Sequence, residues 1–241
     1  MRLTHTRGLD TLTSTLHVNL SKMPVRKIPK SHVSITGRHA SAKSVGPADF
    51  ESLLEADHLI LLDFDRAVRA YEAQPVRVPV PAKKTSYVPD ALAHFHPDAT
   101  GSIRPSELIE VKPAALLKKH RADYAPKFDA ARAYAEERGW IFVLKTEQHI
   151  RTPRLDNLKF LRRYRALDVD PADAALIAKR FAAAGGRCCE TQLLDPSTIG
   201  EDERLRLLPV IWHMVITGQL VADLDRPLTG DSSIALPPIS P

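Results

Sequence analysis

The sequence has very few cysteines, two in 241 residues, and they stand side by side as Cys188 and Cys189. Neighbouring cysteines rarely form a disulfide with each other, and this pair does not have the spacing of a zinc site. We therefore expect two reduced thiols in a cytosolic protein.

Long apolar runs are also missing. No stretch is long enough to span a membrane, and the N-terminus lacks the apolar centre of a signal peptide. No internal repeat is visible. Hydrophobic residues make up 44% of the chain and charged residues 26%, which predicts one large or two modest globular domains with a buried core.

Positive charge is concentrated in the first two thirds of the chain. Residues 1–50 carry a net charge of +6 and residues 51–165 a net charge of +4, whereas residues 166–241 carry −5. Because binding to phosphates needs clustered cations, we expect a nucleic acid to approach the first two thirds. The acidic last third is expected to meet a protein.

The most informative stretch covers residues 86–112. An apolar run leads to Asp90, and after a polar interval a second apolar run contains Glu110 and Lys112. Alternate side chains of a strand share a face, so Glu110 and Lys112 should point the same way. If residues 86–95 form the preceding strand of a hairpin, Asp90 lies beside Glu110 on that face.

This arrangement of Asp90, Glu110 and Lys112 predicts a metal site. Two carboxylates a few ångströms apart repel each other unless a cation neutralises them, and hard oxygen ligands favour Mg²⁺ or Mn²⁺. Lys112 could orient or deprotonate the attacking water, or offset the charge that builds on a scissile phosphate. The alternative, a Glu-x-Lys pair on the surface of a sheet, stays open at this point.

A third carboxylate could complete the site. Pro47 suits the first turn of a helix, and apolar residues then recur at helical spacing over residues 50–61. Glu55 borders this apolar stripe, and we expect it next to Asp90 and Glu110. The alternative is that Glu55 is a solvated residue on the helix surface.

Cations precede and follow this region in the sequence. Residues 22–44 contain prolines and small polar residues, which predict an extended basic arm and not a helix. The arm cations expected to contact phosphates are Arg26, Lys27, Lys30 and Arg38. A long helix predicted over residues 114–139, with Gly139 as its C-cap, carries Lys118, Lys119, Arg121 and Lys127, which could hold a nucleic-acid backbone. In both segments the alternative is a solvated surface.

The other segments complete an α/β pattern. The predicted strands cover residues 71–80, 86–95, 107–112 and 140–145, the first of them at a sheet edge because it contains Pro75, and a helix is predicted over residues 151–164. The order helix, three strands, helix and strand suits a mixed sheet in an α/β nuclease core. In the last third, helices over residues 171–184 and 202–217 and short strands at 219–224 and 234–236 predict a winged helix.

Several short motifs occur along the chain in a fixed order. They are Arg26-Lys27-Ile28-Pro29-Lys30 with Thr36-Gly37, Glu51-Ser52-Leu53-Leu54-Glu55, Leu61-Leu62-Asp63-Phe64-Asp65, Gln74-Pro75, Tyr87-x-Pro-Asp90, Glu110-Val111-Lys112-Pro113 and Asn157-Leu158-Lys159. Together they resemble the TnsA-type endonuclease subunits of heteromeric bacterial transposases, which belong to the restriction-endonuclease-like nucleases. The resemblance runs from about Val25 to the end of the chain.

The resemblance implies roles for single residues. The carboxylate of the family's Ser-x-x-Glu motif falls on Glu55, its metal-binding aspartate on Asp90, the acidic or Gln member of the next strand on Glu110, and its lysine on Lys112. It therefore implies an Mg²⁺ (or Mn²⁺) site formed by the three acids, with all four residues catalytic.

The resemblance also implies an architecture. The expected fold class is α/β, a restriction-endonuclease-like mixed sheet flanked by helices and followed by a small C-terminal winged-helix-like domain. Residues 1–45 form a basic N-terminal arm, residues 46–165 the catalytic domain and residues 166–241 the winged-helix-like domain. The charge of the last part favours docking of a protein over DNA readout.

The implied activity is nicking of the 5′, non-transferred strands of DNA at transposon ends in the bacterial cytoplasm. The implied partners are a DDE-type transposase subunit, which processes the 3′ ends, and an AAA+ regulatory ATPase. Two alternatives are a stand-alone restriction or repair endonuclease and a non-catalytic winged-helix adaptor. Neither Cys188 and Cys189 nor His94 and His96 receive a functional interpretation.

Overall fold

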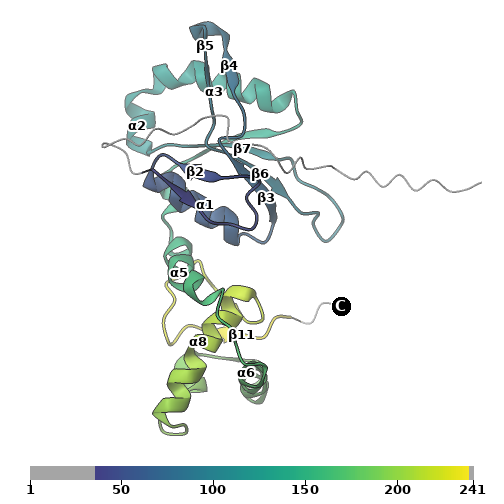
Figure 1. Ribbon diagram of the computed structural model, residues 1–241, viewed down its shortest axis with the longest axis vertical. Coiled ribbons are helices and arrows are strands. Elements are labelled where there is room, and N and C mark those ends of the chain that lie inside the picture. Colours follow the sequence, from purple (N-terminus) through teal and green to yellow (C-terminus); the bar gives the residue numbers. More distant parts are fainter. Residues whose placement is uncertain (1–35, 239–241) are drawn as a thin grey trace, which may run out of the picture.

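The computed structural model describes residues 36–238. The predicted phosphate contacts Arg26, Lys27 and Lys30 lie outside the described residues. Figure 1 shows two parts along the long axis, an α/β part that contains the sheet and a C-terminal part made mainly of helices, with α5 between them. Among residues 36–238, no helix combines the length and the apolar character that crossing a bilayer requires.

A four-stranded mixed sheet forms the centre of the α/β part. Its strands, in the order in which they lie side by side, are β3 (Val68–Ala73), β6 (Ala91–Phe95), β7 (Glu107–Val111) and β8 (Ile141–Lys145). β3, β6 and β7 pair antiparallel, and β8 runs parallel to β7. A parallel neighbour needs a crossover connection, which α2 (Ala114–Lys119) and α3 (Arg121–Glu136) supply. The predicted mixed sheet with flanking helices is confirmed.

Helices cover both faces of this sheet. Figure 1 shows α1 (Leu53–Phe64) and α3 on opposite sides of the sheet. On the α1 side, Ile109 and Val111 of β7 are buried in the main core, whereas Leu108 packs with buried alanines of α3 on the other side. Because side chains alternate along a strand, Glu110 and Lys112 belong to the α3 side.

The first helix begins later than the sequence predicts. Residues Ala48–Phe50 form β2, which pairs antiparallel with β1 (Gly37–His39), so the start of a helix at Pro47 is wrong. The helix begins at Leu53 because Ser52 is its N-cap, and the Ser52 hydroxyl accepts a hydrogen bond from the Glu55 N–H. Residues 37–39 of the predicted arm are therefore part of a paired strand, β1, and not an extended tail.

The predicted strands over residues 71–80 and 86–95 are both interrupted. β3 ends before Gln74, which has a φ of 48°, and the chain continues into β4 (Val78–Val80). β4 pairs antiparallel with β5 (Thr85–Tyr87) in a separate two-stranded sheet, and β6 begins only at Ala91. Proline cannot donate to a ladder, and Pro75 stands where the sheet pairing stops. The edge position predicted for the first segment is confirmed, since β3 is an edge strand.

The long helix predicted over residues 114–139 consists of two helices. The helix is interrupted at His120, between α2 and α3. Pro126 lies inside α3, where it lacks the N–H that would bond to the carbonyl one turn earlier. After α3, Gly139 has a φ of 67°, as expected for a glycine that ends a helix. β8 agrees with the strand predicted over residues 140–145.

The C-terminal part contains the predicted helices and strands, together with one strand, β9 (Arg187–Cys188), and one short helix, α7 (Glu190–Leu193), that were not predicted. Its elements are α6 (Pro171–Ala183), β9, α7, α8 (Glu201–Thr217), β10 (Val221–Ala222) and β11 (Ile234–Ala235). The three strands form a small antiparallel sheet in the order β10-β11-β9, and α8 is continuous through Pro209. The winged-helix class of this part stays a prediction.

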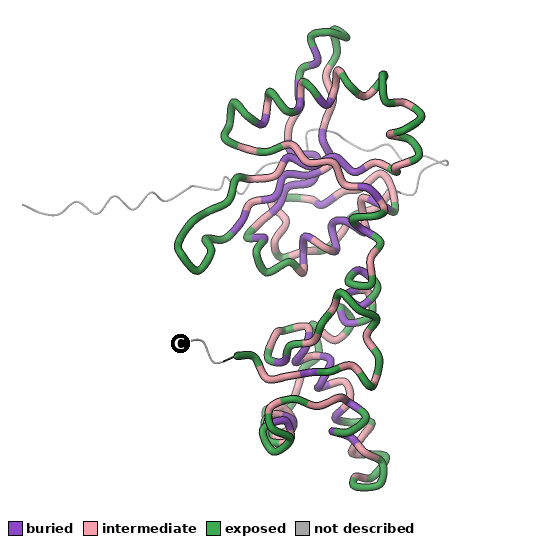
Figure 2. Tube along the Cα trace, turned by 180° about the vertical axis from the view of Figure 1, so that it is seen from behind, coloured by how far each residue is buried: buried purple, intermediate pink, exposed green. Residues whose placement is uncertain are grey.

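The two parts share the helix α5 (Pro153–Leu161). Leu155 and Leu158 are buried in the core of the α/β part, whereas Leu161 is buried in the C-terminal core. Asn157, on the same helix, donates hydrogen bonds to two carbonyl groups and accepts one from the Leu228 N–H, all in the loop after β10. Buried residues accordingly occur in both parts and along α5 (Figure 2). The change from one core to the other therefore occurs inside α5, before the predicted boundary at residue 165.

Asp63, near the end of α1, is a buried acid that ties three segments together. Only 4% of the residue is exposed, and its carboxylate accepts hydrogen bonds from the Ser41 hydroxyl and, at 2.8 Å, from the Arg165 guanidinium. Burial alone would raise the pKa of Asp63. The nearby His39 imidazole, the hydrogen bond from Ser41 and the charge of Arg165 outweigh burial, and the pKa of Asp63 is lowered.

We expect this acid to stabilise the fold at neutral pH and to stop doing so in acid. A group whose pKa is lower in the folded state contributes stability above its unfolded pKa of about 3.9, and this contribution disappears as the pH falls through the folded value. Denaturant unfolding should show Asp63→Asn to be less stable than the wild type by about 1–3 kcal/mol at pH 7, and by less at pH 3. The exposed Asp168→Asn is the control, and an equal deficit of Asp63→Asn at both pH values would contradict the assignment.

Candidate active site

Asp90, Glu110 and Lys112 are in direct contact at one end of the central sheet. The Lys112 Nζ lies 2.9 Å from the Glu110 Oε1 and 3.8 Å from the Asp90 Oδ2. Glu110 belongs to β7, Lys112 follows that strand, and Asp90 immediately precedes β6. The structure thus brings these three predicted residues together, on the shared face that strand alternation predicts for Glu110 and Lys112.

Backbone hydrogen bonds hold this cluster in place. The Asp90 N–H donates to the Ile109 carbonyl at 3.0 Å, and the Asp90 Oδ2 accepts from the Val111 N–H at 2.7 Å. On the other side of β7, the Lys112 N–H donates to the Lys145 carbonyl at 3.0 Å. Both acids and the lysine are therefore attached to the central strands and not to a loop.

The pKa shifts in this cluster are those expected for one ammonium group, that of Lys112, placed between two carboxyl groups. Burial, and then the charge of Glu110, raise the pKa of Asp90, and burial also raises the pKa of Glu110. Burial opposes the charged form of Lys112, but the two carboxylates outweigh it and raise its pKa above the ordinary value. One ammonium group thus faces two acids that are poorly solvated.

Glu55 lies near this cluster but its carboxylate has other partners. Its oxygens accept hydrogen bonds from the Ser52 hydroxyl at 2.9 Å and from the Glu51 N–H at 2.7 Å, so the carboxylate is tied to the N-cap of α1. Its charge nevertheless raises the pKa of Asp90 and of Glu110, so the Glu55 carboxylate is close enough to act on both acids. Within residues 36–238, no three His, Cys, Asp or Glu side chains are close enough together to hold one metal ion.

The donor groups fit a divalent ion of the Mg²⁺ type. Glu110 Oε2 is buried and has no hydrogen-bond partner, although a buried carboxylate oxygen normally has one. Carboxylate oxygens are the ligands that Mg²⁺ and Mn²⁺ prefer. Asp90 and Glu110 are therefore the residues that could hold such an ion, and the ligand role of Glu55 stays a prediction.

Two residues near the site were not among the predicted site residues. Gln74 has a left-handed backbone, which is strained for a residue with a side chain, and it is buried. Its N–H donates to the Asp90 carbonyl, and its side-chain amide donates to Glu51. The Tyr87 hydroxyl is buried without a partner, and burial, Glu110 and Asp90 raise its pKa. Both residues belong to motifs named above, Gln74-Pro75 and Tyr87-x-Pro-Asp90. Their proximity to the site follows only from the fold.

The predicted DNA-contacting residues that the structure describes lie on the surface. Arg38, in β1, forms an ion pair with Asp49 at 2.7 Å. Lys118 and Lys119 are exposed in the last turn of α2, which begins two residues after Lys112. Lys127 of α3 is close enough to Glu110 to lower its pKa. The α2 and α3 cations therefore adjoin the candidate site, and their contact with DNA stays a prediction.

A mixed sheet flanked by helices, with an aspartate beside one strand and Glu-x-Lys at the end of the next, fits a restriction-endonuclease-like nuclease. The model of the family described as TnsA-like endonuclease N terminal matches residues 65–147, which include Asp90, Glu110 and Lys112. The resemblance to TnsA-type endonucleases is thereby confirmed for this segment, and it supports a nuclease of the transposase type. The comparison with curated proteins finds no match.

Proposed function

We propose that this chain is the endonuclease subunit of a heteromeric transposase and that it cuts the 5′, non-transferred strand of DNA at transposon ends with Mg²⁺ (or Mn²⁺). The observation that carries the proposal is the contact of Lys112 with Asp90 and Glu110 inside the segment that matches TnsA-like endonucleases. A half-buried aspartate, a buried glutamate and one ammonium group at the end of adjacent strands suit hydrolysis of a phosphodiester.

In this proposal Asp90 and Glu110 hold the metal ion, and Glu55 is a third ligand. Glu55 can do so while keeping its helix cap, because each carboxylate oxygen accepts more than one interaction. When bound, the ion polarises the scissile phosphate and makes water a stronger nucleophile. The backbone bonds that Asp90 makes to β7 keep both acids in register.

Lys112 is proposed to stabilise negative charge. Its ammonium group already contacts two carboxylates and donates to the Val111 carbonyl at 3.2 Å, so it is oriented before substrate arrives. A pre-oriented cation stabilises charge that develops on a phosphate in the transition state. The exposed cations of α2 are proposed to contact the flanking phosphates.

The choice of DNA site is assigned to partner proteins. The last third of the chain carries a net charge of −5, and α8 begins with three acidic residues. This charge opposes binding to DNA and favours the docking of a protein, proposed to be the DDE-type transposase or the AAA+ ATPase. The winged-helix-like class of this part is an element of the same proposal.

A cleavage assay with and without the transposase tests the proposal. A duplex that contains a labelled transposon end should be nicked on the 5′ strand only when this chain, the transposase and Mg²⁺ are all present. The products should carry 5′-phosphate and 3′-hydroxyl ends. EDTA should abolish cutting, and added Mn²⁺ should restore it.

Each other outcome of this assay points to a different protein. Cutting without the transposase would indicate a stand-alone endonuclease. No cutting by folded protein in any combination would indicate a non-catalytic adaptor. Cutting that persists in EDTA would contradict the metal site.

A further inference from the structure

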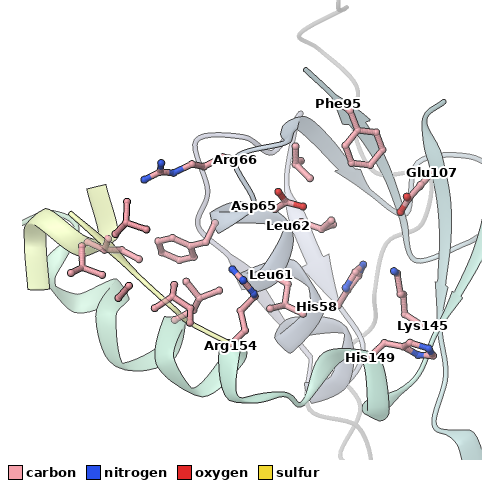
Figure 3. A pocket seen from close by; sticks show the side chains of 18 of the residues that line it. His58, Leu61, Leu62, Asp65, Arg66, Phe95, Glu107, Lys145, His149 and Arg154 are labelled. Carbon is pink, nitrogen blue, oxygen red and sulfur yellow. The ribbon is translucent and has the colours of Figure 1, made fainter. Parts of the chain in front are cut away.

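A cavity of about 650 Å³ lies between the α/β part and the C-terminal part, and Asp90, Glu110 and Lys112 are not among the residues that line it. Its walls come from α1, β8 and α5 on one side and from α8 and the strand β10 on the other. Figure 3 shows side chains from these elements around a common space. The three residues therefore do not line this cavity, although the carbonyl of its lining residue Lys145 accepts a hydrogen bond from the Lys112 N–H.

About half of the cavity wall is apolar. The wall side chains of this kind include Leu61, Phe64, Leu158, Val215, Ile216 and Leu224. They come from both parts of the molecule, so a molecule held here would contact both. Such walls suit an organic body and not a bare ion, since apolar surface gains by leaving water.

One end of the cavity is basic. It is formed by His58 of α1, Lys145 at the end of β8 and His149 of α4 (Glu147–Ile150), which Figure 3 shows near one another. His58 is 5% exposed, and both of its ring nitrogens are buried without a hydrogen-bond partner. A polar group that is buried without a hydrogen-bond partner costs free energy. A ligand that forms a hydrogen bond with the His58 ring would recover this cost.

The other two side chains at this end can donate hydrogen bonds. The Thr146 N–H donates to the His149 Nδ1 at 3.1 Å, so the proton of the neutral ring is on Nε2, which is free to donate. Among residues 36–238, no acidic side chain lies within ion-pair distance of the Lys145 ammonium. Lys145 nevertheless stands close to His58, and burial together with its charge lowers the pKa of His58 to about 3.

Apart from Arg66, the remaining charged groups of the cavity have partners of their own. Arg154 pairs with Asp225 at 2.7 Å, and Arg104 lies 3.9 Å from Glu107. The Asp65 carboxylate accepts a hydrogen bond from the Ala67 N–H. Neither acid of the cavity, Asp65 or Glu107, makes an ion pair with Lys145. The basic end therefore lacks a counterion.

We propose that this cavity binds a small molecule with a terminal oxyanion and an apolar body, the oxyanion contacting His58, Lys145 and His149 and the body contacting the apolar wall. A terminal group is required because the deepest donor, His58, is almost fully buried, whereas a phosphodiester continues as a chain on both sides. An oxyanion supplies acceptors for the Lys145 ammonium and both imidazoles at once. This inference does not rest on the proposed nuclease function.

Titration of the full-length chain with phenyl phosphate, in the absence of divalent metal, tests the inference. We expect saturable binding in calorimetry and an increase in the melting temperature with ligand concentration. Lys145→Met should weaken this binding at least about tenfold, because a hydrogen bond to a charged group is lost. Lys179→Met, an exposed lysine of α6 outside the cavity, should bind like the wild type. The NMR signal of the His58 ring should shift on binding in the wild type.

Titrations with related ligands show which part of the ligand the cavity recognises, and whether the ligand is a small molecule or DNA. Benzyl alcohol, which has the apolar body without the oxyanion, should bind weakly, and inorganic phosphate, which lacks the body, should bind more weakly than phenyl phosphate. Equal affinities of wild type and Lys145→Met for phenyl phosphate, or an unshifted His58 signal, would overturn the inference. Displacement of phenyl phosphate by a duplex without terminal phosphates would assign the site to the DNA backbone and overturn the small-molecule assignment. Because no cleavage is measured, these outcomes are independent of the nuclease proposal.

Discussion

Asp90→Ala is expected to abolish cutting of the 5′ strand, with a rate reduced by about a thousandfold or more. The Asp90 carboxylate accepts a hydrogen bond from the Val111 N–H of β7 and lies close to the Lys112 ammonium group. Its loss removes a proposed metal ligand. Electrostatic stabilisation by a metal ion contributes several kcal/mol, and each 1.36 kcal/mol corresponds to a factor of ten in rate. Single-turnover cleavage of a labelled transposon end, with transposase and Mg²⁺ present, measures the effect.

Folding should survive this substitution. Asp90→Ala leaves the Val111 N–H without its acceptor, but it also removes a half-buried carboxylate whose charge burial, Glu110 and Glu55 disfavour. Asp90→Asn keeps the shape and an acceptor for the Val111 N–H, so it should be inactive while folding like the wild type. Asp123→Asn, an exposed acid of α3, is the matched control and should cut normally. Persistent 5′ cutting by folded Asp90→Ala would refute the site.

Phe181→Ala is expected to lower the free energy of unfolding by about 3–5 kcal/mol. Phe181 lies on α6, is fully buried, and belongs to the core of the C-terminal part. Removal of the ring leaves a cavity that the surrounding helices can fill only in part. Leu205→Ala, on the exposed side of α8, should change the stability little, since 58% of Leu205 is already exposed.

This variant also tests how the two parts are joined. Leu161 of α5 belongs to the C-terminal core, and Ile216 and Leu224 pack against both cores. Because these contacts couple the parts, we expect one cooperative transition that shifts as a whole in chemical denaturation. Two transitions, of which only one responds to Phe181→Ala, would instead support independent domains divided near residue 165.

The amino-acid sequence was most informative where local periodicity decides the structure. Alternation along a strand placed Glu110 and Lys112 on one face, and the contact between them agrees with that placement. Helical spacing and glycine stops located α5, α6 and α8 to within a few residues. These features depend on neighbours in the chain, so they can be read without knowledge of the fold.

Other features depend on competition between backbone partners that lie far apart in the chain. The helix α1 begins at Leu53 because residues 48–50 pair with β1, and the sequence alone favoured a start at Pro47. The predicted strand over residues 71–80 breaks at Gln74, whose left-handed backbone lets its N–H bond to Asp90. Ser52 is a local N-cap signal and Pro75 a local strand breaker, but the pairing of residues 48–50 with β1 and the bond from Gln74 to Asp90 follow only from the fold.

The sequence by itself determined the type of nuclease core and the residues that form its acidic cluster, because strand alternation and motif order are local properties. Only the tertiary structure decided that Glu55 spends its carboxylate on a helix cap, that α5 belongs to two cores, and that His58 and Lys145 share one cavity. These facts arise from packing between distant segments. Each side chain has several possible partners, and the fold selects among them.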